Sequence, residues 1–305
     1  MNAWMVLMKE KLRYLTIILI VCLLAGCAQR NEPAQIAATT LPVYEFTSIL
    51  CQGTDLTVGR LVTENVSCLH DYSLQVRQMR MIEQAEMVVL SGLGLEDFLT
   101  DALAGKNCIV DASQGIEPIC PDEGDHHEHD HHEDDHHGHS HENDPHIWLS
   151  PENAKIMAQN ICQALKKQYP QHQEVFTENL MLLCNQLDEL QAYGQKQLAD
   201  LKSREIITFH DGVAYFAPSV DLEILKAIEE ESGREASAAE LKELIMIVEA
   251  HHPGVFTEKS GSATAAEVIA RETDCSIYQL DMAMSGNSYF DSMYHNIDTV
   301  KEALG

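Results

Sequence analysis

Positive charge is scarce in this sequence. Its 305 residues contain 20 Lys and Arg against 48 Asp and Glu, which gives a formal net charge of -28 at pH 7. Such a chain repels phosphate backbones and anionic headgroups, so binding to nucleic acid is not expected. Ten of the acidic residues lie between Asp122 and Asp144, and the rest of the chain is acidic as well. Cationic ligands suit this balance better than anionic ones.

The sequence also lacks a C-x-x-C pair. It has nine cysteines, and seven remain when Cys22 and Cys27 near the N-terminus are set aside. An odd number cannot all pair within one chain. We expect most of them to be small buried apolar residues, with disulfides open but not assignable. The seven are Cys51, Cys68, Cys108, Cys120, Cys162, Cys184 and Cys275.

The apolar run near the N-terminus is too short to span a bilayer as a stable helix. It covers residues 15–25, about 11 residues, against the ~20 that a bilayer requires. A basic segment precedes it, and LAGC, ending at Cys27, follows and resembles the bacterial lipoprotein box. We therefore predict a lipoprotein signal over 1–26, a lipid on Cys27 and a polar tether over 27–34, with an uncleaved anchor as the alternative. The mature protein would lie outside the cytoplasmic membrane.

Strands and helices alternate after the tether. Short β-branched runs end in small or turn residues, and segments with helical apolar spacing separate them. Strands are predicted within 35–40, 56–62, 87–92 and 107–113, and helices within 44–52 and 73–85. This alternation is typical of a parallel sheet that is covered on both faces. We assign an N-terminal α/β lobe to residues 35–121.

Residues 122–144 form a His/Asp/Glu-rich segment without aliphatic or aromatic side chains, so we expect it to be disordered when empty. A helical segment is predicted over 145–170. Residues 171–203 then show one apolar stripe at spacings of three and four. A helix of roughly 30 residues is about 45 Å long. We expect it to run along both lobes, with a coiled-coil dimer as the alternative.

Residues 204–305 repeat the α/β pattern. Ser237 and Glu240 form a capping box before an apolar run. Strands are predicted within 205–212, 254–259 and 275–281, and helices within 238–250, 264–273 and 288–304. The predicted fold is α/β: two similar lobes with parallel-type sheets, joined by one long rigid helix.

Four residues lie at comparable places in these lobes: His70 after a strand, His146 before a helix, and His210 and Asp281 at strand ends. Ligands of open α/β sheets bind beyond the carboxyl ends of the strands, so two facing lobes would bring the four together. Three imidazoles and one carboxylate suit the tetrahedral coordination of Zn²⁺. An isolated surface histidine is seldom a ligand, and the prediction therefore depends on the four as a set.

The motifs together resemble a known family. They are VGRLV, HDY, MIEQAEMVVLSGLGLEDFL, the His-rich segment, DPHIWLSPENA, TFHDGVAYFA and QLDMAMSGNSYFDSMYHN. In this order, and over nearly the whole mature chain, they resemble the metal-binding lipoproteins of bacterial ABC importers for zinc and manganese. The resemblance implies two lobes joined by a long helix, a metal between them, and ligands at His70, His146, His210 and Asp281.

The third ligand position indicates the metal. Zinc members of the family have His there, as His210 is here, whereas manganese members commonly have Glu. Imidazole suits Zn²⁺, and carboxylate suits the harder Mn²⁺. The family's prolines around the first His and its Asp-Pro-Leu motif are replaced by CLHDYSLQV and LDMAM, although both ligands are kept. Asp71 and Asp211 each follow a ligand and are candidate partners of an imidazole nitrogen.

The His-rich segment is also a feature of zinc members, and it is predicted to be an accessory metal-binding loop. Its histidines are His126, His127, His129, His131, His132, His136, His137, His139 and His141. They are mostly neutral at pH 7 and able to coordinate. Ordering a flexible chain around an ion costs entropy, so these sites should be weaker than a preformed one. We expect capture or sensing of zinc, with a solvated loop that has no metal role as the alternative.

The predicted function is that of an extracytoplasmic solute-binding protein. It would be a monomer without enzymatic activity, held at the membrane by its lipid, that captures Zn²⁺, or alternatively Mn²⁺, for an ABC permease and its ATPase. A zinc hydrolase is the alternative from another class, with Asp211 or Glu258 as general base and an open coordination position. A surface adhesin that uses the same fold for host or matrix contact is the third alternative. We expect His251 and His252 to cap a helix, and His172 and His295 to be exposed.

Overall fold

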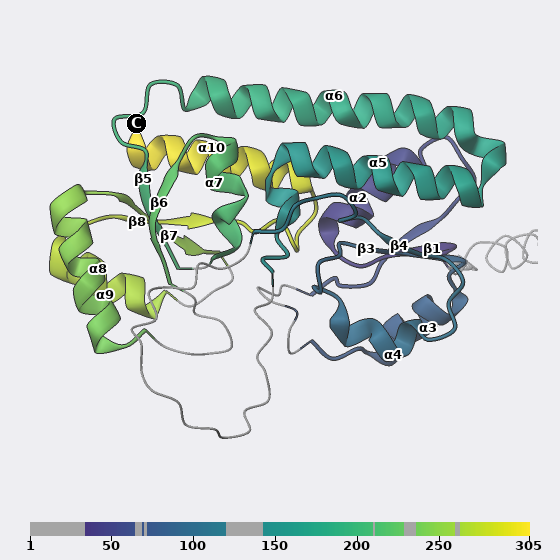
Figure 1. The fold of residues 1–305 in the computed structure, drawn as a ribbon, viewed down its shortest axis with the longest axis horizontal. Helices are drawn as coiled ribbons and strands as arrows, with labels where there is room; N and C mark the ends of the chain where they lie inside the picture. Colours follow the sequence, from purple (N-terminus) through teal and green to yellow (C-terminus); the bar gives the residue numbers. More distant parts are fainter. Residues whose placement is uncertain are drawn as a thin grey trace, which may run out of the picture. The chain divides into compact units, whose positions relative to one another are not determined.

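A computed structural model describes residues 34–64, 69, 72–119, 143–209, 211–228, 236–259 and 263–305. They form two lobes, each built on a four-stranded parallel sheet, with helices on both faces of each sheet (Figure 1). The two lobes confirm the predicted fold class. None of the described helices has the length and apolar composition of a membrane-spanning segment.

The first sheet has the strand order β2-β1-β3-β4, and all its neighbours are parallel. Its strands are β1 (Ile36–Ala38), β2 (Val58–Arg60), β3 (Met87–Leu90) and β4 (Ile109–Asp111). The helices of this lobe are α2 (Leu41–Leu50), α3 (Val76–Gln84) and the short α4 (Thr100–Leu103), which follows the turn η1 (Asp97–Leu99). The predicted strands are confirmed, whereas α4 was not predicted.

The second sheet repeats this order as β6-β5-β7-β8. Its strands are β5 (Glu205–Thr208), β6 (Glu223–Ala227), β7 (Gly254–Glu258) and β8 (Ile277–Leu280). Its helices are α7 (Phe216–Ser219), α8 (Ala238–His251), α9 (Thr264–Thr273) and α10 (Tyr289–Leu304), and α7 follows the turn η4 (Asp211–Ala214). The predicted capping box of α8 is confirmed, because Ser237 N–H donates to Glu240 Oε2 at 2.7 Å and Glu240 N–H donates to Ser237 Oγ at 3.2 Å.

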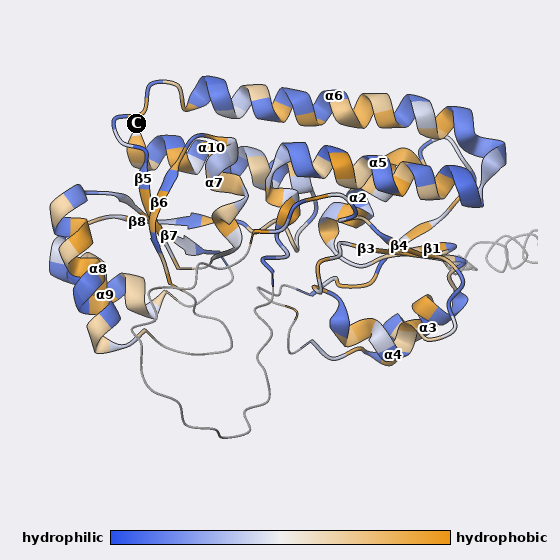
Figure 2. Cartoon of the chain, in the orientation of Figure 1, coloured by the Kyte–Doolittle hydropathy of each residue, from blue (hydrophilic) through white to orange (hydrophobic). Residues whose placement is uncertain are grey.

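Strand residues alternate between two hydrophobic clusters in each lobe. Ile36 and Ala38 of β1 face one cluster, and Ala37 between them faces another. In the second lobe Ile206 and Ile207 are divided in the same way. This is the two-residue period of a strand that is buried on both faces. One cluster includes residues from both sheets and from α2, α5, α6 and α10, so a continuous core connects the lobes. The apolar strands of the first sheet are visible in Figure 2.

Two long helices lie side by side, and one of them, α6, runs from lobe to lobe (Figure 1). They are α5 (Pro151–Gln168) and α6 (Gln173–Gln197), with the turn η3 (Pro170–His172) between them. The predicted extent of 171–203 was too long: α6 has 25 residues and a length of about 37 Å. The guanidinium of Arg204 donates to Leu198 O at 3.0 Å, where the helix has ended. Leu183, Leu187 and Leu190 are fully buried, so the chain itself covers the stripe that a coiled coil would use.

The structure describes several histidines and cysteines that lie outside the predicted metal site. His252 caps α8 in a left-handed conformation, with φ of 52°. The prediction that His172 is exposed was wrong, since this side chain is partly buried and lies 2.9 Å from Asp55; His295 is exposed. Five described cysteines are free thiols: Cys51 and Cys162 are buried, and Cys108, Cys184 and Cys275 are partly buried.

Candidate metal site

His146 is the predicted ligand whose surroundings are described most fully. It lies directly before the 3-10 turn η2 (Ile147–Leu149) and is 5% exposed. Its backbone N–H donates to Asp144 Oδ1 at 2.9 Å, and its ring Nδ1 lies 2.7 Å from the same oxygen. A carboxylate in this position favours the tautomer with the proton on Nδ1, and that tautomer binds a metal through Nε2. The pair thus has the arrangement of an imidazole ligand oriented by a carboxylate.

Two hydrogen bonds join the His146 segment to the strand end that carries Asp281. Trp148 Nε1 donates to Met282 O at 2.7 Å, and Tyr289 OH donates to Trp148 O at 2.8 Å. Trp148 and Tyr289 are fully buried, so water does not compete for these bonds. Because Trp148 follows His146 closely and Met282 follows Asp281, residues far apart in the sequence are brought to one place.

Asp281 is fixed at the carboxyl end of β8 by its own lobe. Its N–H donates to Asn296 Oδ1 at 2.8 Å, and Asn296 Nδ2 donates to its carbonyl oxygen at 2.7 Å. Its Oδ1 accepts the N–H of Ala283 at 2.9 Å. Its Oδ2 lies 3.2 Å from Nζ of Lys259, a residue with an exposed side chain. An ion pair this close to solvent is weak, so Lys259 holds the carboxylate of Asp281 only loosely.

Glu258 is a further acidic group at this place, at the end of β7. Burial raises the pKa of its carboxyl to about 7; the charge of His146 opposes this shift, and the charge of Asp281 reinforces it. With Thr208 and Met282 it also lines a cavity of about 10 Å³, room for about one water-sized species. Glu258 therefore shares the electrostatic environment of both described ligands.

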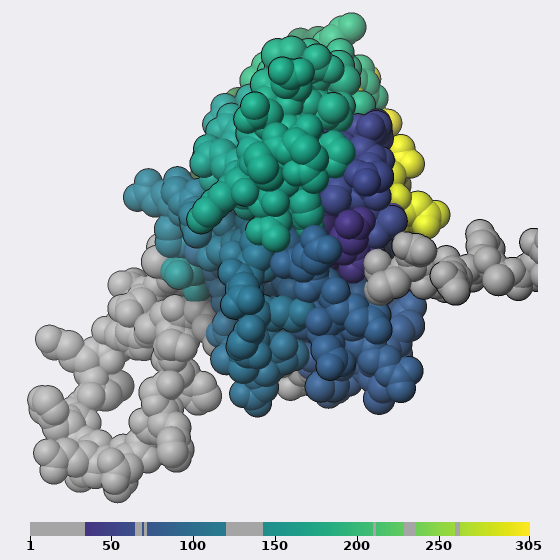
Figure 3. Space-filling view, turned by 90° about the vertical axis from the view of Figure 1, so that its right-hand side faces the viewer, coloured from purple at the N-terminus to yellow at the C-terminus, as the bar shows by residue number. Residues whose placement is uncertain are grey.

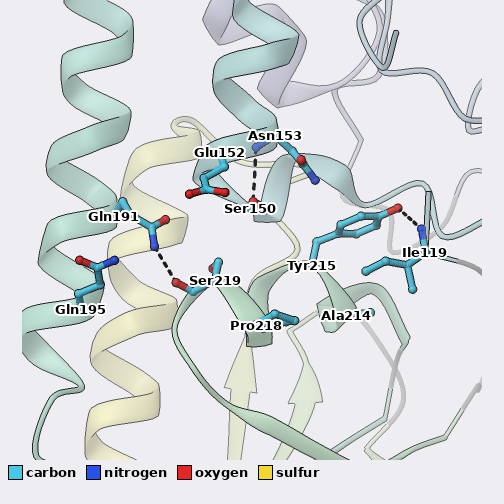
Figure 4. Close-up of a pocket in the computed structure, with 10 residues that line it drawn as sticks. All are labelled: Ile119, Ser150, Glu152, Asn153, Gln191, Gln195, Ala214, Tyr215, Pro218 and Ser219. Atoms are coloured by element: carbon cyan, nitrogen blue, oxygen red, sulfur yellow. Dashed lines mark hydrogen bonds between the residues drawn. The ribbon is translucent and has the colours of Figure 1, made fainter. Parts of the chain in front are cut away.

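Ile119 and Asp144, which lie on either side of segment 120–142, are hydrogen-bonded to each other close to His146. Asp144 N–H donates to Ile119 O at 3.1 Å. Tyr215 OH accepts the N–H of Ile119 at 2.8 Å (Figure 4) and donates to Asp144 O at 3.1 Å. Tyr215, directly before α7, thus holds together the two ends between which the His-rich segment is inserted.

A larger cavity of about 410 Å³ opens beside Tyr215, between α5, α6 and α7 (Figure 4). Gln191 of α6 crosses it and donates to Ser219 O at 2.7 Å. Among the described residues that line it, there is one carboxylate, that of Glu152, and neither an imidazole nor a thiol. This composition does not suit a transition-metal ion, so the cavity is separate from the predicted metal site.

The structure brings together two of the four predicted ligands, His146 and Asp281. His70, His210, the nine histidines of the His-rich segment and the side chain of Asp211 lie outside the described residues, as do Asp71 and Cys27. Leu69 and Phe209, which precede His70 and His210, are buried. Within the described ranges, no three His, Cys, Asp or Glu side chains are grouped closely enough to hold a metal ion.

Residues 36–303 match the protein family described as ZnuA, the periplasmic component A of a zinc-uptake complex. The chain belongs to the ZnuA family. This membership confirms the predicted family and the predicted class of function, and it does not favour the manganese alternative. Members of the ZnuA family are extracytoplasmic metal-binding transport components that act with an ABC permease and ATPase, rather than enzymes.

Known proteins resemble the chain over most of its length. The high-affinity zinc uptake system protein ZnuA of Bacillus subtilis is 28% identical over 288 residues, which is 90% of this chain and 89% of that protein. The zinc-binding lipoprotein AdcA of Streptococcus pneumoniae is 26% identical over 312 residues, which is 96% of this chain and 61% of that protein. A crystal structure of ZnuA aligns with a TM-score of 0.74 at 27% identity, over 88% of this chain and 99% of that one.

Three residues around the candidate site were not identified from the sequence. Asp144 was assigned to the end of the disordered segment, but its carboxylate is buried against His146. Trp148 and Tyr215 were not assigned any role in holding the site. The DPHIWLSP motif was the available signal for Asp144 and Trp148, since a buried tryptophan near a ligand must find an acceptor for its N–H.

Proposed function

We propose that the chain binds one Zn²⁺ between its lobes through His70, His146, His210 and Asp281, and delivers it to an ABC permease. The single observation that supports this most is the Asp144–His146 pair, a buried imidazole oriented by a carboxylate at 2.7 Å. Binding and release are sufficient for this function, and no bond chemistry is required. The zinc-uptake family of the chain and the names of its relatives agree with it.

Zinc rather than manganese is favoured by the proposed donor set. Three imidazole nitrogens and one carboxylate suit the borderline-soft Zn²⁺, whereas Mn²⁺ prefers more oxygen ligands. Asp281 as the fourth ligand closes the tetrahedron. A closed tetrahedron has no position for an activated water, which argues against the hydrolase alternative.

We further propose that the His-rich segment is an accessory collector of zinc. Its two ends are joined beside His146 by the hydrogen bonds among Ile119, Asp144 and Tyr215. Any ion that a histidine of this segment binds is therefore concentrated near the proposed transport site. The same nearness makes the segment a suitable sensor of zinc abundance.

The remaining proposals concern the state of the protein in the cell. A lipid on Cys27 would anchor it outside the cytoplasmic membrane, in agreement with the lipoprotein named among its relatives. We propose that it acts as a monomer, because the apolar stripe of α6 is buried within the chain itself. An adhesin role would need a surface contact in addition to metal binding.

The test is a competition titration with a chromophoric chelator, Zn²⁺ against Mn²⁺, on mature protein from which residues 125–141 are deleted. We expect one tight site that prefers Zn²⁺, and further weak sites in the undeleted protein alone. His210→Ala in the deleted protein should abolish the tight site, whereas His295→Ala, a change at an exposed histidine, should leave it intact.

Two results would contradict the proposal. Unchanged affinity in His210→Ala would remove that residue from the site. Loss of all tight binding on deletion of 125–141 would show that the transported ion is held by the His-rich segment and not by the lobes.

A further inference from the structure

The loop after Asp281 is held by groups outside its own lobe at every second residue. Residues 282–288, which we name the Asp281 loop, join β8 to α10. Three of its carbonyl oxygens accept such hydrogen bonds: Met282 O from Trp148 Nε1 at 2.7 Å, Met284 O from the N–H of Leu41 at 3.3 Å, and Gly286 O from Arg60 Nη1 at 2.8 Å. The loop is therefore bound along its length by the first lobe and by Trp148, which precedes α5.

Glu45 of α2 holds the far end of the same loop. Its Oε1 accepts the hydroxyl of Ser288 at 3.1 Å, and its Oε2 accepts the N–H of Tyr289, the first residue of α10. A carboxylate at a helix N-terminus is stabilised by the helix dipole. The ring of Phe46 packs edge-on against that of Tyr289, with centroids 5.0 Å apart. Figure 3 shows the first described residues of the N-terminal lobe (purple) beside the C-terminal helix α10 (yellow).

The side chain of Arg60 is itself held in place by an aromatic ring of the first lobe. Its guanidinium lies over the ring of Tyr44, 5.8 Å from the centroid, a cation–π arrangement. The positive charge of Arg60 also favours the ionised form of Glu45, although burial is the stronger effect and raises the pKa of that carboxyl. Arg60 at the end of β2 and Glu45 on α2 thus bind two points of the Asp281 loop from the first lobe.

We propose that Arg60 and Glu45 are positioning residues for the metal, which act on it through the Asp281 loop. This inference rests on the function proposed above. Asn296 fixes the backbone of Asp281 from the second lobe, and the first lobe then sets the path of the loop. Ala283 has a positive φ of 54°, which is strained for a residue with a side chain, so this bend needs outside contacts to persist. Without Arg60, the Asp281 carboxylate samples more orientations and the metal leaves faster.

The test measures zinc dissociation by stopped flow, with excess chromophoric chelator, on the mature protein. Arg60→Met keeps the apolar length over Tyr44 but removes the donors, and we expect dissociation to be about tenfold faster, the effect of losing one charged hydrogen bond. Arg60→Lys should be intermediate. Arg80→Met, which changes an exposed arginine of the same lobe, is the matched control. Glu45→Gln gives an independent variant if Arg60→Met folds poorly.

A second arm separates positioning from general stability. In an Asp281→Asn background Arg60→Met should change dissociation by less than about twofold, because the residue through which it acts is already weakened. An unchanged rate in Arg60→Met and Glu45→Gln, or the same tenfold change in the Asp281→Asn background, overturns the proposal. If the unmodified protein has no tight zinc site, the proposed function fails and this inference fails with it; tight binding with unchanged variant rates refutes the inference alone.

Discussion

The two sheets share one strand order, yet the carboxyl ends of their strands differ in chemistry. In the first lobe the buried carboxylate of Glu96 accepts hydrogen bonds from Thr39 Oγ at 2.5 Å and from the N–H groups of Ser91 and Gly92 at 2.7 and 3.0 Å. In the second lobe Glu258 and Asp281 lie at strand ends beside His146. Among the described residues, the same topology thus carries a closed internal network in the first lobe and two carboxylates beside His146 in the second, because function depends on the site and not on the fold.

Removal of His146 should give the largest effect. His146→Ala deletes a proposed ligand and leaves Asp144 as a buried carboxylate without its imidazole, so we expect zinc affinity to fall at least about a thousandfold, or about 4 kcal/mol. The measurement is the chelator competition described above, with His295→Ala as control. An affinity within tenfold of that of the unmodified protein would contradict the assignment of His146 as a ligand. It would also remove the proposed chemical difference between the two lobes.

Removal of Glu96 tests the closed network of the first lobe. Glu96→Ala leaves three buried donors without their acceptor, and we expect the free energy of unfolding to fall by about 3 kcal/mol. Urea denaturation of the metal-free protein measures this change. Glu152→Ala, at a carboxylate that lines the larger cavity, is the control and should change stability little. A loss below about 1 kcal/mol in Glu96→Ala would show that the network does not stabilise this lobe.

Asp144→Asn should weaken the proposed site without removing a ligand. The substitution keeps the shape but takes away the charge that orients His146, and such partners of ligating histidines are worth about tenfold to a hundredfold in metal affinity. Zinc titration of Asp144→Asn beside Glu152→Gln measures the difference. Equal affinities in the two variants would mean that Asp144 is structural and does not act on the metal.

A last prediction concerns the pH dependence of stability. Burial raises the pKa of Glu258 from its ordinary value of 4.5 to about 7, so the folded chain binds this proton more tightly than the unfolded chain does. The stabilisation is complete below pH 4.5 and is lost as the pH rises through about 7. Relative to the unmodified protein, metal-free Glu258→Gln should therefore gain stability between pH 5 and pH 8, by about 2.5 kcal/mol. Parallel pH profiles for the variant and the unmodified protein, measured by denaturation with a chelator present, would disprove this.

The sequence predicts those parts of the fold that have a strong local signal. The bounds of α9 agree with its prediction, and the capping box of α8 places the start of that helix. β6 (Glu223–Ala227) was missed because it is an edge strand with partly exposed side chains and no regular alternation. The length of α6 was overestimated because its end depends on Arg204, a residue beyond the apolar stripe.

The candidate site was predictable to a different degree for each residue. His146 and Asp281 could be selected because ligand-type residues at strand ends and before a helix follow a general rule for α/β sheets. Asp144 is the last acidic residue of a long acidic run, and composition does not distinguish it from its neighbours. The contact of Trp148 with Met282 joins positions 134 residues apart, and such a tertiary contact has no local signal in one sequence.

The apolar cluster that runs from one sheet to the other has a calorimetric consequence. Because residues of both lobes, α5 and α6 are packed in the same cluster, the lobes cannot separate without exposing it to water. Binding that leaves the cluster intact buries little new apolar surface, so the heat-capacity change of zinc binding should be close to zero. The enthalpy of binding would then vary little with temperature, as expected for a rigid receptor whose affinity comes from its coordination bonds.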